Sequence, residues 1–500
     1  MESTMAKKAL VSMLMGLAFI FIQVFGDNFP VNQLSSGLYH DQMRKMQAFK
    51  TSLIRRELDS SISPSPSYAP SPQRSHVYHL IQYGADPTGK LDSTEALLKA
   101  IADAYHGPSE GFLMEGIKNL GGAQIDLQGG LYLISQSLRL PAAGAGNLMI
   151  HGGTLRASNE FPRDGYLIDL SASSSTNNEE EVESSMDAQM SSSSSYNYEY
   201  ITLKDLMLDS NFRGGGIFVK NSLRISIDNC YISHFTSNGI LVQGGHETYI
   251  RNSFLGQHIT AGGDPGEKDF SGTAINLMGN DNAVTDVVIF SAAVGVMVSG
   301  QANILTGVHC YNKATGFGGT GIYLKLPNLT QTRIVNCYMD YTGIVAEDPV
   351  QLLVSNCFFL GDAHVLLKSI NGIAKGVNIV DNMFCGSDKG IGIVQLDHSR
   401  TPFKEIDEVV VERNNVRGMS LKATVAKGSV RGTGSSWTID FNSVLLFPNI
   451  IKNVQYSLGP SGSLFPNHAL RNLSDNRVVI ESDVAVSATV YVTVDQGVSN

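Results

Sequence analysis

Carboxylates near a histidine are the residues of this chain whose types and spacing suit acid–base chemistry. Asp209 directly follows the apolar run 206–208, and Asp269 lies between His258 and a second apolar run at 274–277. Two carboxyl groups can act as general acid and general base, and a nearby histidine can position or tune them. Each aspartate can equally be a turn residue that bonds its own backbone. Further carboxylates in similar places are Asp264, Glu267, Asp340 and Asp362.

Three cations lie beside short apolar runs and suit the binding of an acidic ligand. They are Arg213, Lys220 and Lys325. An arginine can hold a carboxylate through two parallel hydrogen bonds, and a lysine acts as a point charge. The alternative interpretation is an ordinary solvated surface.

The elements that must position these groups are repeats. One phrase, an asparagine between two short apolar runs, occurs around Asn229 and Asn252 and returns around Asn336, Asn356 and, more faintly, Asn382. A second phrase, glycine followed by alternating aliphatic residues, lies between the copies, as at 239–242 and 321–324. Periods near 20 to 30 residues are typical of solenoids.

The spacing predicts an all-β fold, a right-handed parallel β-helix. Asn229 and Asn252 are 23 residues apart (252 − 229), which leaves room for two short strands per copy but not for a helical repeat. We expect nine or more coils between residues 120 and 417. The asparagines should lie at a turn, where their amides can bond the backbone of the next coil. The alternative is an irregular β-sandwich.

Composition excludes some partners and leaves others open. The formal net charge of −10 does not suggest a nucleic-acid-binding protein, although a local basic groove could still bind an acidic polymer. Of the five cysteines, Cys230, Cys310, Cys337 and Cys357 occupy what we interpret as one slot of the first phrase. We interpret them as a ladder of small buried residues, with a Cys337–Cys357 disulfide as the alternative. No CxxC spacing indicates a metal site, and we expect no cofactor.

The chain divides into four predicted segments. Residues 1–26 resemble a secretory signal peptide, with a signal anchor as the alternative, and residues 27–75 form a Ser/Pro-rich spacer. Residues 76–430 contain the β-helix, in which the serine-rich stretch 171–195 is predicted to be a disordered insertion. Residues 431–500 read as a small C-terminal β-rich module. Asn328 and Asn472 begin glycosylation sequons, which are meaningful for a secreted chain.

The beginning of the folded part carries a family resemblance. The phrase YGADPTGKLDSTEALLKAIADA and the following GGAQIDLQGGLYLI resemble the opening of the pectate-lyase-like superfamily, in which the helix caps the solenoid. The resemblance covers residues 78 to 417. In detail the chain is most similar to the divergent plant polygalacturonases of the quartet type. The resemblance implies an enzyme that hydrolyses the α-1,4-galacturonan of pectin. We expect a secreted cell-wall protein that acts as a monomer, with no nucleic-acid partner and no membrane partner after removal of the signal peptide.

The catalytic aspartates of typical polygalacturonases have no match here. The slots that correspond to their NTD and GDD phrases hold Gly215, Ser237 and Asn238. An inverting hydrolase needs two carboxyls about 6.5–9.5 Å apart. We therefore take Asp269 as the first catalytic candidate and Asp209 as the second, with His258 beside them. The alternatives are a pectate-lyase-type eliminase and a non-catalytic wall-binding protein.

Overall fold

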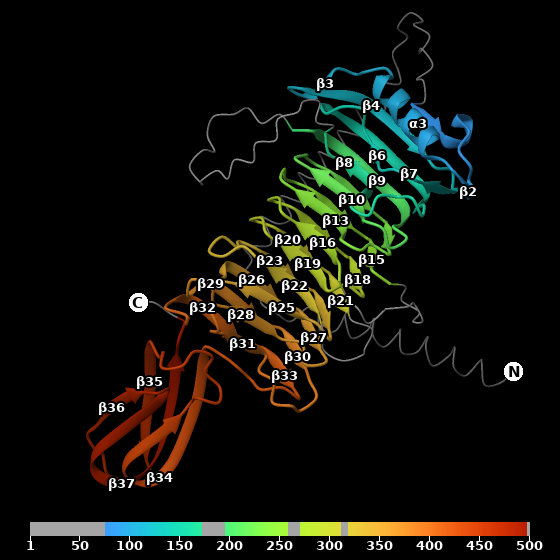
Figure 1. The fold of residues 1–500 in the computed structure, drawn as a ribbon. Coiled ribbons are helices and arrows are strands. Elements are labelled where there is room, and N and C mark those ends of the chain that lie inside the picture. The colour runs from blue at the N-terminus through green and yellow to red at the C-terminus, as the bar shows by residue number, and fades with distance from the viewer. Residues whose placement is uncertain (1–75, 173–195, 259–270, 312–318, 498–500) are drawn as a thin grey trace, which may run out of the picture. The chain divides into compact units, whose positions relative to one another are not determined.

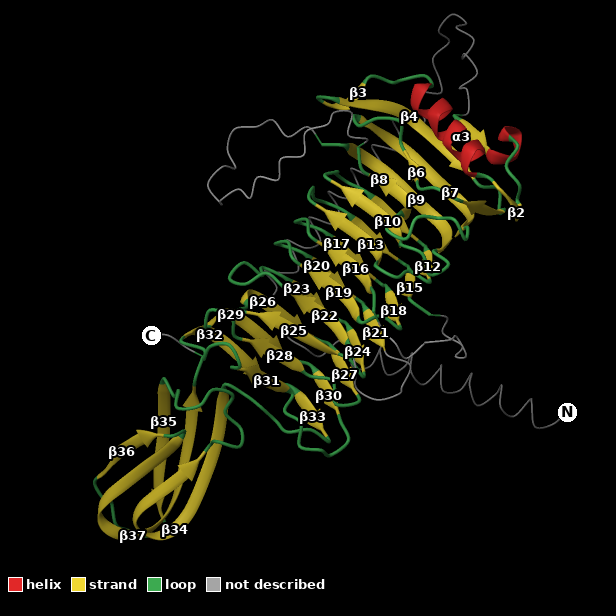
Figure 2. Cartoon of the chain, viewed as in Figure 1, coloured by secondary structure: helices red, strands yellow, loops and turns green. Residues whose placement is uncertain are grey.

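The computed structural model describes residues 76–172, 196–258, 271–311 and 319–497. Figures 1 and 2 show this part of the chain as a succession of stacked strands, with the helix α3 (Thr94–His106) near its beginning. The predicted signal peptide, the Ser/Pro-rich spacer and residues 173–195 lie outside the described residues.

The described chain winds into a right-handed parallel β-helix, as the repeat predicts. Each regular coil contributes one strand to each of three parallel sheets, and each strand pairs with its copies in the preceding and following coils. The third sheet has ten strands, so the expectation of nine or more coils is confirmed. The first and second sheets share the long strands β7 and β9, which turn a corner without a break in strand structure.

The strand bounds follow the two phrases of the sequence. The first sheet contains β1 (Val77–His79), β4 (Ile117–Asp126), β7 (Ala145–Ala157), β9 (Tyr198–Asp209), β11 (Ser226–Asp228), β14 (Tyr249–Arg251), β17 (Ala283–Thr285), β20 (Ile304–Thr306), β23 (Arg333–Val335), β26 (Val350–Ser355), β29 (Ile373–Val380) and β32 (Glu405–Glu412). The second continues through β2 (Thr88–Asp92), β5 (Leu131–Ile134), β12 (Tyr231–Ser233), β15 (Phe254–Gly256), β18 (Val288–Phe290), β21 (His309–Tyr311), β24 (Tyr338–Asp340), β27 (Phe358–Leu360), β30 (Met383–Cys385) and β33 (Asn415–Arg417). The third consists of β6 (Leu138–Arg139), β8 (Tyr166–Leu170), β10 (Gly215–Lys220), β13 (Asn238–Gln243), β16 (Thr273–Leu277), β19 (Val294–Val298), β22 (Thr320–Leu324), β25 (Gly343–Glu347), β28 (Val365–Lys368) and β31 (Val394–Asp397).

Ladders of aliphatic side chains fill the interior. Ile227, Ile250 and Val284 are register partners on successive strands of the first sheet, and all three are fully buried. Burying one such side chain contributes about 1.5–3 kcal/mol, so every coil adds a similar increment to the stack. Because the inner face is fixed by this pattern, the alternate residues of each strand face outward and are available for function.

Asparagines hold the corner between the first and second sheets. Asn229, Asn252, Asn336 and Asn356 all have φ between 51° and 55°, a left-handed conformation that asparagine tolerates well. The expectation that their amides bond the backbone of the next coil is wrong for two of them. Asn229 Nδ2 donates to Asp205 (2.7 Å) and Asn252 Nδ2 to Asp228 (2.9 Å), both on the preceding coil.

The five cysteines are all free thiols. Cys230, Cys337 and Cys357 follow the left-handed corner residues and point into the core, where they are buried. Cys310 does not share that slot: it is the middle residue of β21 and pairs in register with Met339. The ladder of small buried residues therefore contains three of the four cysteines expected in it.

The two ends of the described chain differ from the coils. Helix α3 (Thr94–His106) packs its buried residues Leu97 and Ile101 against the first coils, so the predicted capping helix is present. It follows the 3₁₀ turn Leu80–Tyr83 and precedes β3 (Phe112–Met114), which pairs antiparallel with β4. After the last coil come β34 (Val425–Asp440), β35 (Asn453–Pro460), β36 (His468–Ser474) and β37 (Arg477–Asp495), an antiparallel sheet with its own hydrophobic core.

Candidate active site

Two of the three predicted catalytic residues, Asp209 and His258, lie at the corner between the second sheet and the third. Asp209 ends β9, and His258 follows β15 two coils later. Asp269, Asp264 and Glu267 lie outside the described residues. That segment begins after His258, and at its far end the Ser271 N–H donates to Gln257 Oε1 at 3.0 Å. The structure thus defines the surroundings of Asp209 and His258 only.

Asp209 is held by three neighbours. His234 Nδ1 lies 2.7 Å from Asp209 Oδ1, the Asn211 N–H donates to the same oxygen at 2.9 Å, and Arg156 Nε lies 3.4 Å from Oδ2. Burial by itself would raise the pKa of Asp209. The hydrogen bond from His234, with the Asn211 N–H and the charge of Arg156, outweighs it and lowers the pKa below its ordinary value. Asp209 is therefore an ionised carboxylate at neutral pH, which suits a general base and not a proton donor.

Ring contacts through Phe212 connect His258 with His234, the hydrogen-bond partner of Asp209. The Phe212 ring lies 4.7 Å from the His234 ring and 5.5 Å from the His258 ring, centroid to centroid. The repeat explains the arrangement, because Asp209 pairs with Ser233 and Ser233 with Gly256, so the residues that follow each strand gather at one corner. We call Arg156, Asp209, Phe212, His234 and His258 the histidine–aspartate cluster.

A cavity of about 370 Å³ opens beside this cluster. Arg156 and Asn211, which both contact Asp209, line it, and Glu160 adds an exposed carboxylate, whereas Asp209 itself is not one of the lining residues. Half of the Arg156 side chain is exposed, so its guanidinium can contact a ligand while it is paired with Asp209. The cavity therefore offers a cation for an acidic sugar next to an ionised carboxylate.

One row of residues on the outer face of the third sheet lacks the usual acids, as the sequence indicates. Successive strands contribute a row that contains Tyr166, Gly215, Asn238, Thr273, Val294 and Thr320. None of these residues has a carboxylate. Asn238 Nδ2 donates to the Tyr166 hydroxyl at 2.9 Å, so neutral polar groups stand where an acid pair would be expected.

The three predicted binding cations lie on or beside this sheet but apart from one another. Lys220 ends β10, Lys325 follows β22, and both are exposed. Arg213 precedes β10 and donates from Nη1 to the Phe161 carbonyl at 3.3 Å. Only Arg213 is near the histidine–aspartate cluster in sequence, directly after Phe212. The sequon residues Asn328 and Asn472 are exposed as well.

The third sheet also carries a charged group that was not predicted from the sequence. The buried Glu347 accepts a hydrogen bond from the Tyr323 hydroxyl at 2.6 Å and one from Lys368 Nζ at 3.0 Å. The Glu347 hydrogen bond, followed by that to Tyr323, raises the pKa of Lys368. Glu347 and Lys368 are thus paired with each other and with Tyr323, and the three residues link the successive strands β22, β25 and β28. We interpret this group as structural. Its signal was present, since Tyr323 and Glu347 lie one coil apart, 24 residues along the chain.

Asp340, a carboxylate noted in the sequence, has the opposite character to Asp209. Burial raises its pKa, and its Oδ1 is buried with no hydrogen-bond partner in the described chain. It lies beside Tyr311 on the outer face of the second sheet. Five strand steps separate it from Asp209, about 24 Å at about 4.8 Å per step. The two carboxylates cannot act on one glycosidic bond.

Within the described residues, no group of three or more His, Cys, Asp and Glu side chains lies close enough together to hold a metal ion. No helix in this part of the chain has both the length and the apolar character needed to span a membrane.

The comparison of the whole chain with known proteins decides the family. The chain is 62% identical over 495 residues to polygalacturonase QRT3 of Arabidopsis thaliana, which covers 98% of this chain and 99% of that protein. The chain belongs to the quartet-type polygalacturonase family. Membership in this family confirms the resemblance found at residues 78–417 and extends it to nearly the full length. No family model matches the chain.

Solved structures provide more distant likenesses. The endo-xylogalacturonan hydrolase of Aspergillus tubingensis is 11% identical with a TM-score of 0.39, and the match covers 69% of this chain and 95% of that one. The A-module of the mannuronan C-5 epimerase AlgE4 of Azotobacter vinelandii is 14% identical with a TM-score of 0.40, over 68% and 96% of the two chains. The family membership of the chain therefore follows from its identity to the Arabidopsis protein alone.

Proposed function

We propose that this protein is a secreted glycoside hydrolase that cleaves the α-1,4-galacturonan of pectin in the plant cell wall. The observation that carries the proposal is the 62% identity to a polygalacturonase over nearly the whole of both chains. The parallel β-helix supports it, because its long outer faces suit a linear polymer. We expect the protein to act as a monomer and without a cofactor.

In the proposed reaction the histidine–aspartate cluster supplies the base. Asp209, ionised at neutral pH, accepts a proton from the attacking water, while His234 holds the carboxylate in one orientation. Arg156 or Arg213 pairs with a galacturonate carboxylate and so positions the sugar. The proton donor must be a second carboxyl about 6.5–9.5 Å away if the enzyme inverts, and Asp269 remains our prediction for it.

Product chemistry tests the reaction. Purified protein incubated with polygalacturonate should release new reducing ends without the ultraviolet absorbance of a conjugated double bond. That absorbance would instead indicate elimination, and polymer binding with neither product would indicate a wall-binding protein. The absence of acids from the Gly215–Asn238 row is the observation that favours the wall-binding alternative.

Substitution of the base tests the site. Asp209→Asn should lower turnover by about a hundredfold or more, because a general base typically contributes that much. Asp205→Asn is the matched control, since Asp205 lies on the same strand but is exposed and accepts a hydrogen bond from the side-chain amide of Asn229. Asp209→Asn with wild-type turnover would overturn the assignment.

A further inference from the structure

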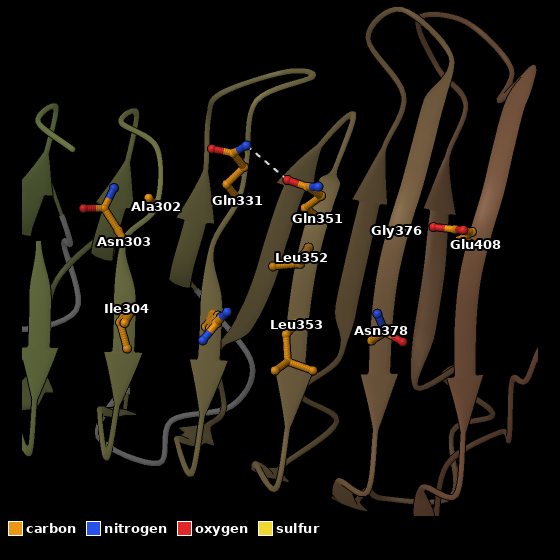
Figure 3. Close-up of a pocket in the computed structure, with 11 residues that line it drawn as sticks. Ala302, Asn303, Ile304, Gln331, Gln351, Leu352, Leu353, Gly376, Asn378 and Glu408 are labelled. Carbon is orange, nitrogen blue, oxygen red and sulfur yellow. Dashed lines mark hydrogen bonds between the residues drawn. The ribbon is translucent and has the colours of Figure 1, made fainter. Parts of the chain in front are cut away.

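A second cavity, larger than the one beside the histidine–aspartate cluster, lies elsewhere in the described chain. It is a groove of about 810 Å³ on the outer face of the first sheet, shown in Figure 3. Strands β20, β23, β26, β29 and β32 contribute its walls and floor. Its lining residues are Ala302, Asn303, Ile304, Gln331, Arg333, Gln351, Leu352, Leu353, Gly376, Asn378 and Glu408.

Two rows of residues give the groove its direction. Ile304, Arg333, Leu353 and Asn378 are register partners on successive strands and form the lower row. The upper row contains Gln331, Gln351, Gly376 and Glu408, each with φ between 41° and 60°. The left-handed residues bend every coil at the same level and so leave a concave line along the helix axis. Five strands at about 4.8 Å per step make it about 19 Å long, the length of a short run of sugars.

An unpaired arginine lies on the floor of this groove. Arg333 is exposed and makes no ion pair within the described chain. On the same sheet Arg251 is paired with Asp228 at 3.2 Å, and Arg413 beyond β32 is paired with Asp381 at 2.8 Å. An exposed guanidinium without a carboxylate partner is free to bind an anionic group of a ligand.

The rest of the lining is mainly neutral and suits sugar hydroxyls and ring carbons. Gln331 Nε2 donates to Gln351 Oε1 at 3.0 Å, which leaves the outer oxygen of Gln331 and the amino group of Gln351 available, as Figure 3 shows. Asn378 makes no side-chain hydrogen bond within the described chain. Ile304 and Leu353 supply apolar contacts. The single acid, Glu408, lies at the opposite end from Ile304 and would repel a second carboxylate there.

We propose that this groove binds a linear uronic-acid polysaccharide whose carboxyls are mostly esterified, and that it does so apart from the catalytic site. One free carboxylate pairs with Arg333, and uncharged sugars lie over Leu353 and Asn378 towards Glu408. The polymer class rests on the proposed function, whereas the preference for sparse charge comes from the groove alone. The groove would hold the enzyme on esterified pectin while the catalytic site acts on free galacturonate.

Affinity electrophoresis of the full chain tests the proposal with highly methyl-esterified pectin and with fully de-esterified polygalacturonate in parallel gels. We expect stronger retardation by the esterified polymer. Arg333→Ala should weaken that retardation about fivefold or more, and Arg251→Ala, the paired control on the same sheet, should not. Asn378→Leu should weaken it as well, without a change of charge. Circular dichroism should show that all three variants are folded.

The proposed binding groove and the proposed enzymatic function can fail independently in these experiments. Hydrolysis of a short soluble oligogalacturonide should be the same in Arg333→Ala and wild type, since the groove lies outside the histidine–aspartate cluster. Equal retardation of Arg333→Ala and wild type in esterified pectin would overturn the proposal, as would stronger binding to polygalacturonate. If the wild type hydrolyses no oligogalacturonide but is still retarded by esterified pectin, the proposed enzymatic function is refuted and the proposed binding groove is supported.

Discussion

The contact between Asp209 and His234 should contribute measurably to stability as well as to catalysis. The two side chains are 14% and 18% exposed, and their atoms are 2.7 Å apart, so the interaction is little screened by solvent. A hydrogen bond to a charged group contributes about 1.5–3 kcal/mol. We expect a coupling free energy of about 2 kcal/mol between Asp209→Asn and His234→Ala.

A double-mutant cycle in urea measures this coupling. His234 has other contacts in the molecule, so the single substitution overstates the pair, and the cycle subtracts those contacts. Wild type, both single variants and the double variant are unfolded at pH 7 under equilibrium conditions. A coupling below about 0.5 kcal/mol would show that the two side chains are neighbours without being partners.

The stabilising contribution of Asp209 should also depend on pH, in a direction that follows from its lowered pKa. The pKa of Asp209 is lower in the folded protein than its ordinary value of 3.8, so its ionised form is stabilised by folding. This contribution is fully present above the ordinary value and is lost as the pH falls through the lower, folded pKa. The stability difference between wild type and Asp209→Asn should therefore shrink below about pH 4. A difference that grows on acidification would refute the reasoning.

Two further predictions concern the core. Burial raises the pKa of Cys230 and of Cys310 to about 12. A thiol reagent should therefore modify only the partly exposed Cys385 in the native protein, and all five cysteines after unfolding. Fast reaction of two or more thiols in the native protein would contradict this. Asn382→Ala should lower the free energy of unfolding in urea by about 3 kcal/mol, because its buried side-chain amide accepts a hydrogen bond from the Cys357 N–H at 2.9 Å and donates one to the Val354 carbonyl. Asn252→Ala, at an exposed corner, serves as the control and should lower it by about 1 kcal/mol.

The fold could be predicted because its signal is repeated. Each copy of the first phrase places an apolar residue inward and an asparagine at the corner, so Asn229 and Asn252 report the length of a coil directly. Chance agreement becomes small over several copies. The misplaced Cys310 shows the limit of this method: the phrase around it has Gly307 at the corner in place of an asparagine, and without that marker the register was displaced by two residues.

The candidate site was harder to predict, since its residues belong to different coils. Asp209 was identified as a carboxylate after a strand, but its partner His234 is 25 residues away. That separation is close to one coil, so a search for polar residues one period apart would have found the pair. The groove around Arg333 has no such signal, because its shape comes from backbone bends at residues as different as Gln351, Gly376 and Glu408.

The left-handed bends of the first sheet have a consequence for how this surface can change. Every coil contributes one residue to each row, so one substitution alters the groove at one step along the polymer and leaves the adjoining steps intact. Removing one complete coil would shorten all rows together and keep their order. The polymer preference that we propose for this groove can therefore be changed in discrete steps, one coil at a time, without rebuilding the interior that supports it.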